Sequence, residues 1–245
     1  LPPGSNVPPL VEQLKFNPVV AGAEPNYVVT IPSPPGFATT AGASGSITAP
    51  AAGKDSSPVA ILDSGLMPKI GLESLVAGQL DALDPDRPLN DTLGHGTQMA
   101  LIAAGAVVPA GADSGDSSAG VPLLPIRAFD DNGNASNFSL MRSIEYAIGH
   151  GARVINMSWG TETASDFLAE AVSYAQSKGA VVVAAAGNTP SQKPQYPAAC
   201  DGVVAVSAAN EDGSLWENSN YGNFITLAAP GKAQLVVDIL GEEDH

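Results

Sequence analysis

An aspartate followed 32 residues later by a histidine is the feature of this chain that best fits catalysis. Asp63 ends the apolar run 59–62, so we expect its carboxylate at the end of a buried strand. His95 stands in Gly94-His95-Gly96-Thr97 before another apolar run, which predicts an imidazole at the start of a buried helix. A fixed carboxylate beside an imidazole can orient a general base and stabilise its protonated form. Either motif alone also fits a turn or a structural histidine, but their order and spacing favour catalysis.

A third candidate stands further along the chain, at the end of the run Ala184-Ala185-Ala186-Gly187-Asn188. The preceding residues predict a buried strand, so the amide of Asn188 would lie at the carboxyl end of that strand. An asparagine donates a hydrogen bond without carrying charge, which suits a developing oxyanion. The alternative is an asparagine in a left-handed turn before Thr189-Pro190.

The three motifs together resemble the subtilisin-like serine proteases, or subtilases, over residues 58–231. The resemblance implies that Asp63 orients His95, and that His95 acts first as general base and then as general acid for a serine. It gives Asn188 the role of oxyanion donor. One position departs from the family pattern, because Gln98 stands where many subtilases have a second histidine.

The same resemblance implies two segments that flank a bound peptide. One is the strand end in Asn156-Met157-Ser158-Trp159-Gly160, and the opposite one lies in Asp131-Asn132-Gly133-Asn134-Ala135. A peptide between two such edges would be held by strand addition. Ordinary turns are the alternative at each segment. The substrate-binding residues expected are Ser158, Trp159, Gly160, Gly133, Asn134, Ala186 and Gly187.

The serine of such a triad is not expected within this chain. The family order is Asp, His, Ser, and residues 218–231 resemble the strand that precedes the serine motif. The resemblance requires Gly-Thr-Ser about twenty residues further on, whereas the 14 residues after Gly231 contain no serine. We therefore expect one fragment of a nicked or truncated protease, with the serine on a C-terminal fragment. The alternatives are a pseudoprotease that binds peptides or partners, and a naturally short product.

Apolar runs and helical patterns alternate from Pro58 onward, which predicts an α/β fold with a doubly wound, mostly parallel sheet and helices on both faces. Ligands bind beyond the carboxyl ends of such strands. The resemblance makes residues 58–245 a subtilisin-like catalytic domain whose C-terminal part is missing. The predicted strands are 59–62, 123–128, 153–157, 180–185, 203–207 and 224–228, and the predicted helices are 95–106, 137–149 and 163–178.

The first 57 residues differ in composition from the rest, being rich in Pro, Gly, Ala and Ser. Residues 32–57 show no periodicity and are predicted to be a linker. Glu24-Pro25-Asn26-Tyr27 resembles the end of a subtilase inhibitory propeptide, so residues 1–31 are interpreted as a propeptide end, as in a zymogen. We expect residues 17–29 along the domain surface, aimed at the cleft. A surface strand or a disordered arm is the alternative.

The charge and hydropathy of the chain limit the classes of molecule that it can bind. Ten basic against 25 acidic residues give a net charge of −15, which repels nucleic acid and anionic lipid. No apolar run is long enough to cross a membrane. No export signal is seen at Leu1, so we expect any such signal to have been removed already. The family resemblance implies a secreted or extracytoplasmic protein acting on peptides or proteins. The single Cys200 excludes an intrachain disulfide and is expected to be a buried thiol.

Calcium is a possible ligand, because the family often binds it, but no metal site is predicted. Four aspartates could supply oxygen ligands, yet none of them forms a recognisable calcium loop. Solvated turns are the simpler interpretation. The candidates are Asp113, Asp116, Asp130 and Asp131.

Overall fold

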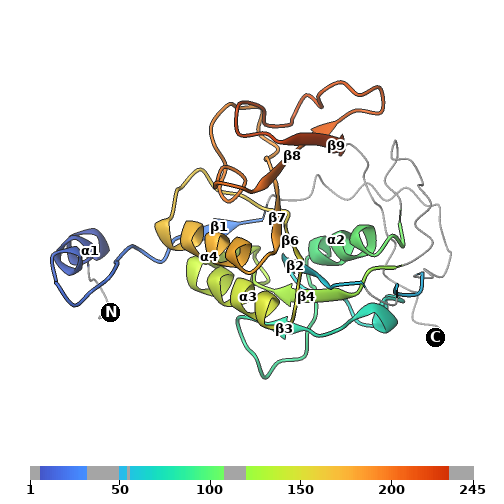
Figure 1. The fold of residues 1–245 in the computed structure, drawn as a ribbon, viewed down its shortest axis with the longest axis horizontal. Helices are drawn as coiled ribbons and strands as arrows, with labels where there is room; N and C mark the ends of the chain where they lie inside the picture. Colours follow the sequence, from blue (N-terminus) through green and yellow to red (C-terminus); the bar gives the residue numbers. More distant parts are fainter. Residues whose placement is uncertain (1–5, 32–49, 54–55, 108–119, 232–245) are drawn as a thin grey trace.

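A parallel sheet organises the computed structural model, which describes residues 6–31, 50–53, 56–107 and 120–231 (Figure 1). Seven strands pair in the order β3-β4-β2-β6-β7-β8-β9, and all the pairs are parallel. The predicted α/β architecture is therefore confirmed. The strands are β2 (Val59–Asp63), β3 (Leu80–Asp81), β4 (Leu123–Arg127), β6 (Val154–Met157), β7 (Val181–Ala185), β8 (Val204–Ala209) and β9 (Leu227–Pro230).

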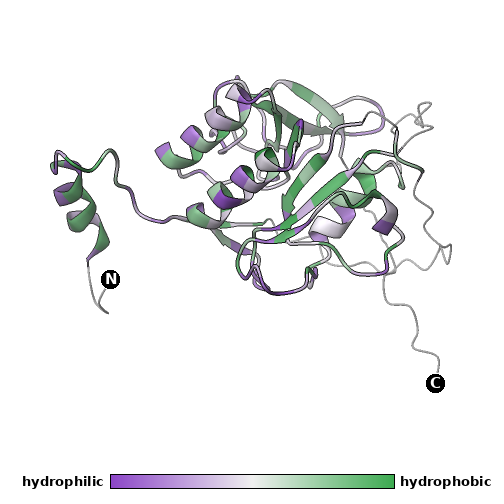
Figure 2. Ribbon diagram, turned by 60° about the horizontal axis from the view of Figure 1, so that its bottom comes forward, coloured by the Kyte–Doolittle hydropathy of each residue, from purple (hydrophilic) through white to green (hydrophobic). Residues whose placement is uncertain are grey.

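Helices cover both faces of the sheet. Helix α2 (His95–Ala103) packs on one face, where Leu101 and Ala100 join a cluster with Ile61 of β2. Helices α3 (Asn137–Gly149) and α4 (Asp166–Ser177) lie on the other face, over a larger cluster that includes Leu140 and Val172. In Figure 2 the strands between these layers are coloured as hydrophobic. Burial on both faces explains why the strands read as continuous apolar runs.

Three predicted boundaries are corrected by local hydrogen bonds. Helix α4 begins at residue 166 and not 163, because the hydroxyl of Ser165 accepts from the N–H of Leu168 and caps the first turn. Helix α2 ends at residue 103 and not 106, where a tighter bond from Gly105 N–H to the Ile102 carbonyl closes it. Strand β9 begins at residue 227 and not 224, because residues 222–225 form a turn closed by the N–H of Ile225.

Four short elements carried no sequence signal that predicted them. They are α1 (Val7–Lys15), the 3₁₀ helix η1 (Glu73–Leu75), β3 and β5 (Asn134–Ser136). Strand β1 (Val28–Thr30) lies at the end of the segment that was expected along the domain surface. Strands β1 and β5 form a second, two-stranded antiparallel sheet, in which Val29 is opposite Ala135. Figure 1 shows α1 apart from the layered domain, joined to it by the extended segment that leads into β1.

Part of the predicted linker is held by the domain. Gly120 donates to the carbonyl of Ala51 (2.7 Å) and accepts from the N–H of Gly53 (3.2 Å). Most of the predicted linker, residues 32–49 and 54–55, lies outside the described residues. Among the described helices, none has the length and apolar character needed to cross a membrane.

Candidate active site

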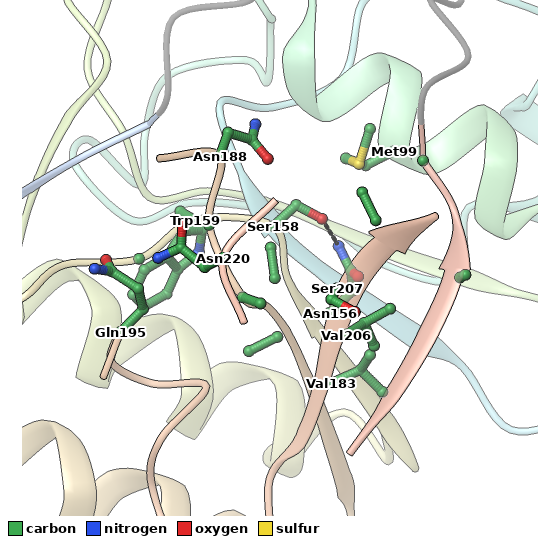
Figure 3. Close-up of a pocket in the computed structure, with 18 of the residues that line it drawn as sticks. Met99, Asn156, Ser158, Trp159, Val183, Asn188, Gln195, Val206, Ser207 and Asn220 are labelled. Carbon is green, nitrogen blue, oxygen red and sulfur yellow. Dashed lines mark hydrogen bonds between the residues drawn. The ribbon is translucent and has the colours of Figure 1, made fainter. Parts of the chain in front are cut away.

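The topology brings the predicted catalytic residues to one edge of the sheet. Strands β2, β6 and β7 are neighbours, and Asp63, Ser158 and Asn188 lie at or just beyond their carboxyl ends. His95 comes from the first turn of α2, which packs against β2. One pocket is lined by His95, Ser158 and Asn188 together. Figure 3 shows Ser158 and Asn188 among the residues that line it. Residues separated by more than a hundred positions are therefore gathered as the sequence analysis expected.

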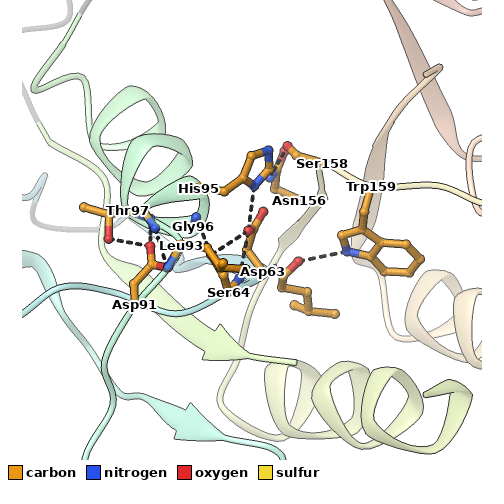
Figure 4. Close-up of polar contacts among 12 residues, drawn as sticks. Asp63, Ser64, Asp91, Leu93, His95, Gly96, Thr97, Asn156, Ser158 and Trp159 are labelled. Carbon is orange, nitrogen blue, oxygen red and sulfur yellow. Dashed lines mark hydrogen bonds and ion pairs between the residues drawn. The ribbon is translucent and has the colours of Figure 1, made fainter. Parts of the chain in front are cut away.

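Asp63 and His95 are in direct contact. The Nδ1 of His95 lies 2.7 Å from Oδ1 of Asp63, whose side chain is fully buried (Figure 4). The same oxygen accepts from the N–H of Ser64 (2.8 Å), and the Ser64 hydroxyl in turn accepts from the N–H of Gly96 (2.9 Å). A Cβ at position 96 would lie 2.5 Å from the Gly65 carbonyl oxygen, so only glycine lets the helix start come this close to the strand end.

Burial and nearby carboxylates act in opposite directions on the pKa of His95. Burial by itself would lower the pKa of the imidazole, because it penalises the charged form. The negative charge of Asp63, its hydrogen bond to Nδ1 and the charge of Asp91 outweigh burial and raise the pKa of His95 above its ordinary value. A raised pKa means that folding favours the imidazolium, which is the form a general base takes after it has accepted a proton.

The turn that carries Asn188 is held by Asn220, which the sequence analysis missed. The Oδ1 of Asn220 accepts from the N–H of Thr189 (2.8 Å), and its own N–H donates to the carbonyl of Gly187 (3.0 Å). Gly187 has a φ of 109°, and a Cβ there would lie 2.9 Å from Nδ2 of Asn220. Asn188 itself is exposed. Its backbone is thus fixed on both sides while its amide stays accessible.

The strand end after β6 supplies the next wall of the pocket. Ser158 and Gly160 line it, and Ser158 Oγ accepts from Nδ2 of Asn156 at 2.9 Å. Trp159 is buried, and its indole N–H donates to the Leu62 carbonyl (2.9 Å), which locks this segment to β2. The predicted residues Ala186 and Gly187 also line the pocket, as does Gln195, which carried no motif.

The other expected peptide-binding strand is occupied by the chain itself. Asn134 lies in β5 and pairs with Thr30 of β1, and the Gly133 carbonyl accepts from the N–H of Ile31 (2.9 Å). Within β1, Val29 is 1% exposed whereas Val28 is 64% exposed, so alternate side chains face the domain. The N-terminal arm, residues 22–31, therefore adds a strand to the edge that sequence analysis assigned to substrate.

Further contacts fix the arm before it reaches β5. The carboxylate of Glu24 accepts from the Asp166 N–H (3.0 Å), from Asn137 Nδ2 (3.1 Å) and from the Ser165 hydroxyl. The side-chain oxygen of Asn26 accepts from the N–H of Phe138 (3.1 Å). These acceptors satisfy donors at the first turns of α3 and α4, which have no partner within their own helices.

A buried arginine links the loop before His95 to the loop before β5. Arg127 donates to Asp81 and to Asp131, each at 2.9 Å, and Asp131 also accepts from the Thr92 hydroxyl at 2.9 Å. The hydrogen bond from Thr92, helped by the charge of Arg127, holds the pKa of Asp131 below its ordinary value. The two loops that approach the arm are therefore braced against each other.

Two of the calcium candidates are engaged in hydrogen bonds within the protein. Asp130 accepts from the N–H groups of Asn132 and Asn134, and Asp131 is bound as above. Asp113 and Asp116 lie outside the described residues. Within the described ranges, no group of three or more His, Cys, Asp or Glu side chains is placed to hold a metal ion. Cys200 is half-buried, and burial raises the pKa of its thiol.

Three curated proteins are similar to this chain at 34 to 36% identity. The chain is 34% identical over 238 residues to the thermophilic serine proteinase of Bacillus sp. (strain AK1), covering 92% of this chain and 58% of that protein. It is 35% identical over 174 residues to thermitase of Thermoactinomyces vulgaris, covering 71% and 62%. It is 36% identical over 174 residues to the minor extracellular protease Epr of Bacillus subtilis (strain 168), covering 71% and 26%. The chain thus spans less than two thirds of each relative's length.

Two solved structures resemble the fold. A cold-adapted subtilisin-like serine proteinase superposes with a TM-score of 0.61 at 23% identity, covering 71% of this chain and 62% of that one. A lanthipeptide protease superposes with a TM-score of 0.59 at 27% identity, covering 71% and 55%. The family model described as "Subtilase family" (Peptidase_S8) matches residues 54–243, well over half of the chain. With this fold and these motifs, the chain belongs to the subtilase family of serine proteases.

Proposed function

We propose that this chain supplies the Asp–His pair and the oxyanion donor of a serine endopeptidase. The observation that carries the proposal is the 2.7 Å contact between His95 Nδ1 and the fully buried carboxylate of Asp63. A buried carboxylate needs a hydrogen-bonding partner within the protein, and for Asp63 that partner is Nδ1 of His95. The other imidazole nitrogen, Nε2, can then accept the proton of a nucleophile. The nucleophile is a serine outside these 245 residues, on a C-terminal segment.

That segment has a place to pack. Beside His95, the pocket continues along apolar side chains of α2, β7 and β8, among them Met99, Ile102, Val183 and Val206. An apolar groove on the face of a parallel sheet is suited to a helix. A helix whose first turn carries the serine would bring the hydroxyl toward His95 Nε2 and bury these side chains.

The reaction then follows from the positions of the groups. The serine Oγ attacks the scissile carbonyl as its proton passes to Nε2 of His95, and Asp63 stabilises the imidazolium. The carbonyl oxygen becomes an oxyanion, to which the Asn188 amide donates. His95 returns the proton to the leaving amine, which departs and leaves an acyl-enzyme. Water, deprotonated by His95, releases the acid product and regenerates the serine.

The arm acts as an inhibitory segment in this proposal. It adds a strand to β5, the edge that a substrate peptide needs, and its Thr30 lines the same pocket as His95. A peptide cannot pair with this edge of β5 while β1 occupies it. The protein would accordingly be made as a zymogen and act outside the cytoplasm on peptide or protein substrates, as the names of its extracellular relatives suggest.

A pseudoprotease is the second candidate, because β5 binds a strand without any involvement of His95. The two functions differ in one variant, His95→Ala, made in the protein together with its serine-bearing segment. For the endopeptidase we expect peptide hydrolysis that falls by at least about a thousandfold when the base is removed. Peptide binding that is unchanged by the substitution, with no hydrolysis in either form, would identify the binding module instead.

A further inference from the structure

A second buried carboxylate lies at the start of α2, and the reaction scheme above does not use it. Asp91 is 1% exposed, and both of its oxygens are engaged (Figure 4). One accepts from the N–H groups of Gly94 (2.8 Å) and Leu93 (3.2 Å). The other accepts from the N–H (2.8 Å) and the hydroxyl (2.7 Å) of Thr97. A single side chain therefore binds the backbone on both sides of His95.

The local sequence explains why a distant cap is needed here. Gly94 occupies the N-cap position of α2 with a φ of 75° and has no side chain to cap the helix. The first N–H groups of a helix have no partner within it, and Asp91 supplies one for Thr97. A negative charge at this end also complements the helix dipole.

The same network reaches the turn that follows Asp63. The hydroxyl of Thr97 donates to Asp91 and accepts from the N–H of Met67 (3.0 Å). Since Met67 is only four residues beyond Asp63, this chain of bonds ties the helix that carries the imidazole to the strand end that carries its partner. The distance between the imidazole of His95 and the carboxylate of Asp63 is thus fixed both by the start of α2 and by the turn after β2.

We propose that Asp91 is a positioning residue for His95: by fixing the backbone of residues 93–97 and linking it to the turn after β2, its carboxylate holds the imidazole against Asp63. The proposal rests on the proposed role of His95 as the base. Asp91 touches neither the imidazole nor a substrate in this scheme and acts through the helix start.

The position of Asp91 has an electrostatic consequence that can be measured. Two carboxylates, those of Asp63 and Asp91, favour the imidazolium form of His95 and oppose the effect of burial on its pKa. Replacing Asp91 by asparagine removes one of these charges. It also places an NH₂ group among donors, so at least one of the four hydrogen bonds is lost.

The test is an NMR titration of the three histidines in the chain of residues 1–245, with His150→Gln and His245→Gln to assign the signals. In Asp91→Asn we expect the pKa of His95 to fall, and the amide protons of Gly94 and Thr97 to exchange about tenfold faster, as the loss of one net hydrogen bond implies. Asp86→Asn is the matched control, since it removes the same charge from an exposed side chain and should leave both readouts unchanged.

A second pair of variants covers the case in which Asp91→Asn does not fold. Thr97→Val removes the hydrogen bonds of the hydroxyl but keeps the charge of Asp91. Thr97→Ser keeps the hydroxyl bonds as well as that charge. We therefore expect His95 to titrate at lower pH in Thr97→Val than in Thr97→Ser. If His95 titrates in Asp91→Asn as it does in Asp86→Asn while the melting temperature falls, Asp91 is only a helix cap and the proposal is wrong. Identical titrations for the two Thr97 variants would overturn it equally. Neither readout needs the serine, so a failure of the proposed protease activity would be seen separately.

Discussion

Replacing Asp63 by asparagine should lower kcat of the serine-containing protein by about 10⁴-fold, the size known for this replacement in a serine protease of another fold. The carboxylate oxygen now lies 2.7 Å from Nδ1 of His95 and accepts a hydrogen bond from it, which keeps the proton on Nδ1. An amide in the same place can turn its NH₂ toward Nδ1, which leaves the proton on Nε2 and removes the lone pair that the serine needs. The loss therefore appears in turnover, measured by steady-state cleavage of a peptide.

The KM for that peptide should change little, because Asp63 is fully buried and cannot contact substrate. Asp84→Asn, an exposed carboxylate on the loop before His95, is the control and should cleave like the unmodified protein. Turnover that stays within tenfold of the original in Asp63→Asn would mean that another group orients the base, and the assignment of this pair would be wrong.

Replacing Val29 by aspartate should detach the arm from β5. Val29 is 1% exposed and packs in the main hydrophobic cluster, so its replacement would bury a carboxylate without a partner, at a cost of several kcal/mol. That cost exceeds what a three-residue strand can offset. Hydrogen exchange should become fast at Ile31 and Asn137, whose N–H groups now donate to Gly133 and Tyr27 across the contact.

Val28→Asp is the control, since Val28 is the adjacent residue of the same strand and is 64% exposed. It should leave exchange at both amides unchanged. In the serine-containing protein, Val29→Asp should also raise cleavage of an added peptide, while Val28→Asp should not. Equal exchange in the two variants would show that side-chain burial does not hold the arm, and the inhibitory role would lose its support.

The sequence was most informative where a single motif sits on a long apolar element. Asp63 and His95 were predicted because each adjoins a buried run, and a parallel sheet then has only one edge at which strand ends and ligands meet. The same reasoning placed Asn188 beside them. The arm was expected along the surface, but β1 and β5 have three residues each and no periodicity that reveals their pairing.

Residues that act through the backbone of others could not be predicted. Asn220 binds on both sides of Asn188, and Asp91 binds on both sides of His95, yet neither stands in a motif that indicates this. Their roles depend on where remote backbone N–H groups point, which is decided by tertiary packing. The predicted start of α4 was wrong for a related reason, because Ser165 caps this helix only where the fold places its hydroxyl near the N–H of Leu168.

The most direct test of the whole account is labelling with a serine-directed phosphonate. Residues 1–245 alone should not react, whereas addition of the serine-bearing segment should give one label per complex, located on that segment and absent when the chain carries His95→Ala. Such a pattern requires that this chain provide the base and another segment the nucleophile. Stoichiometric labelling of residues 1–245 by themselves, or labelling of the complex that is indifferent to His95, would contradict it.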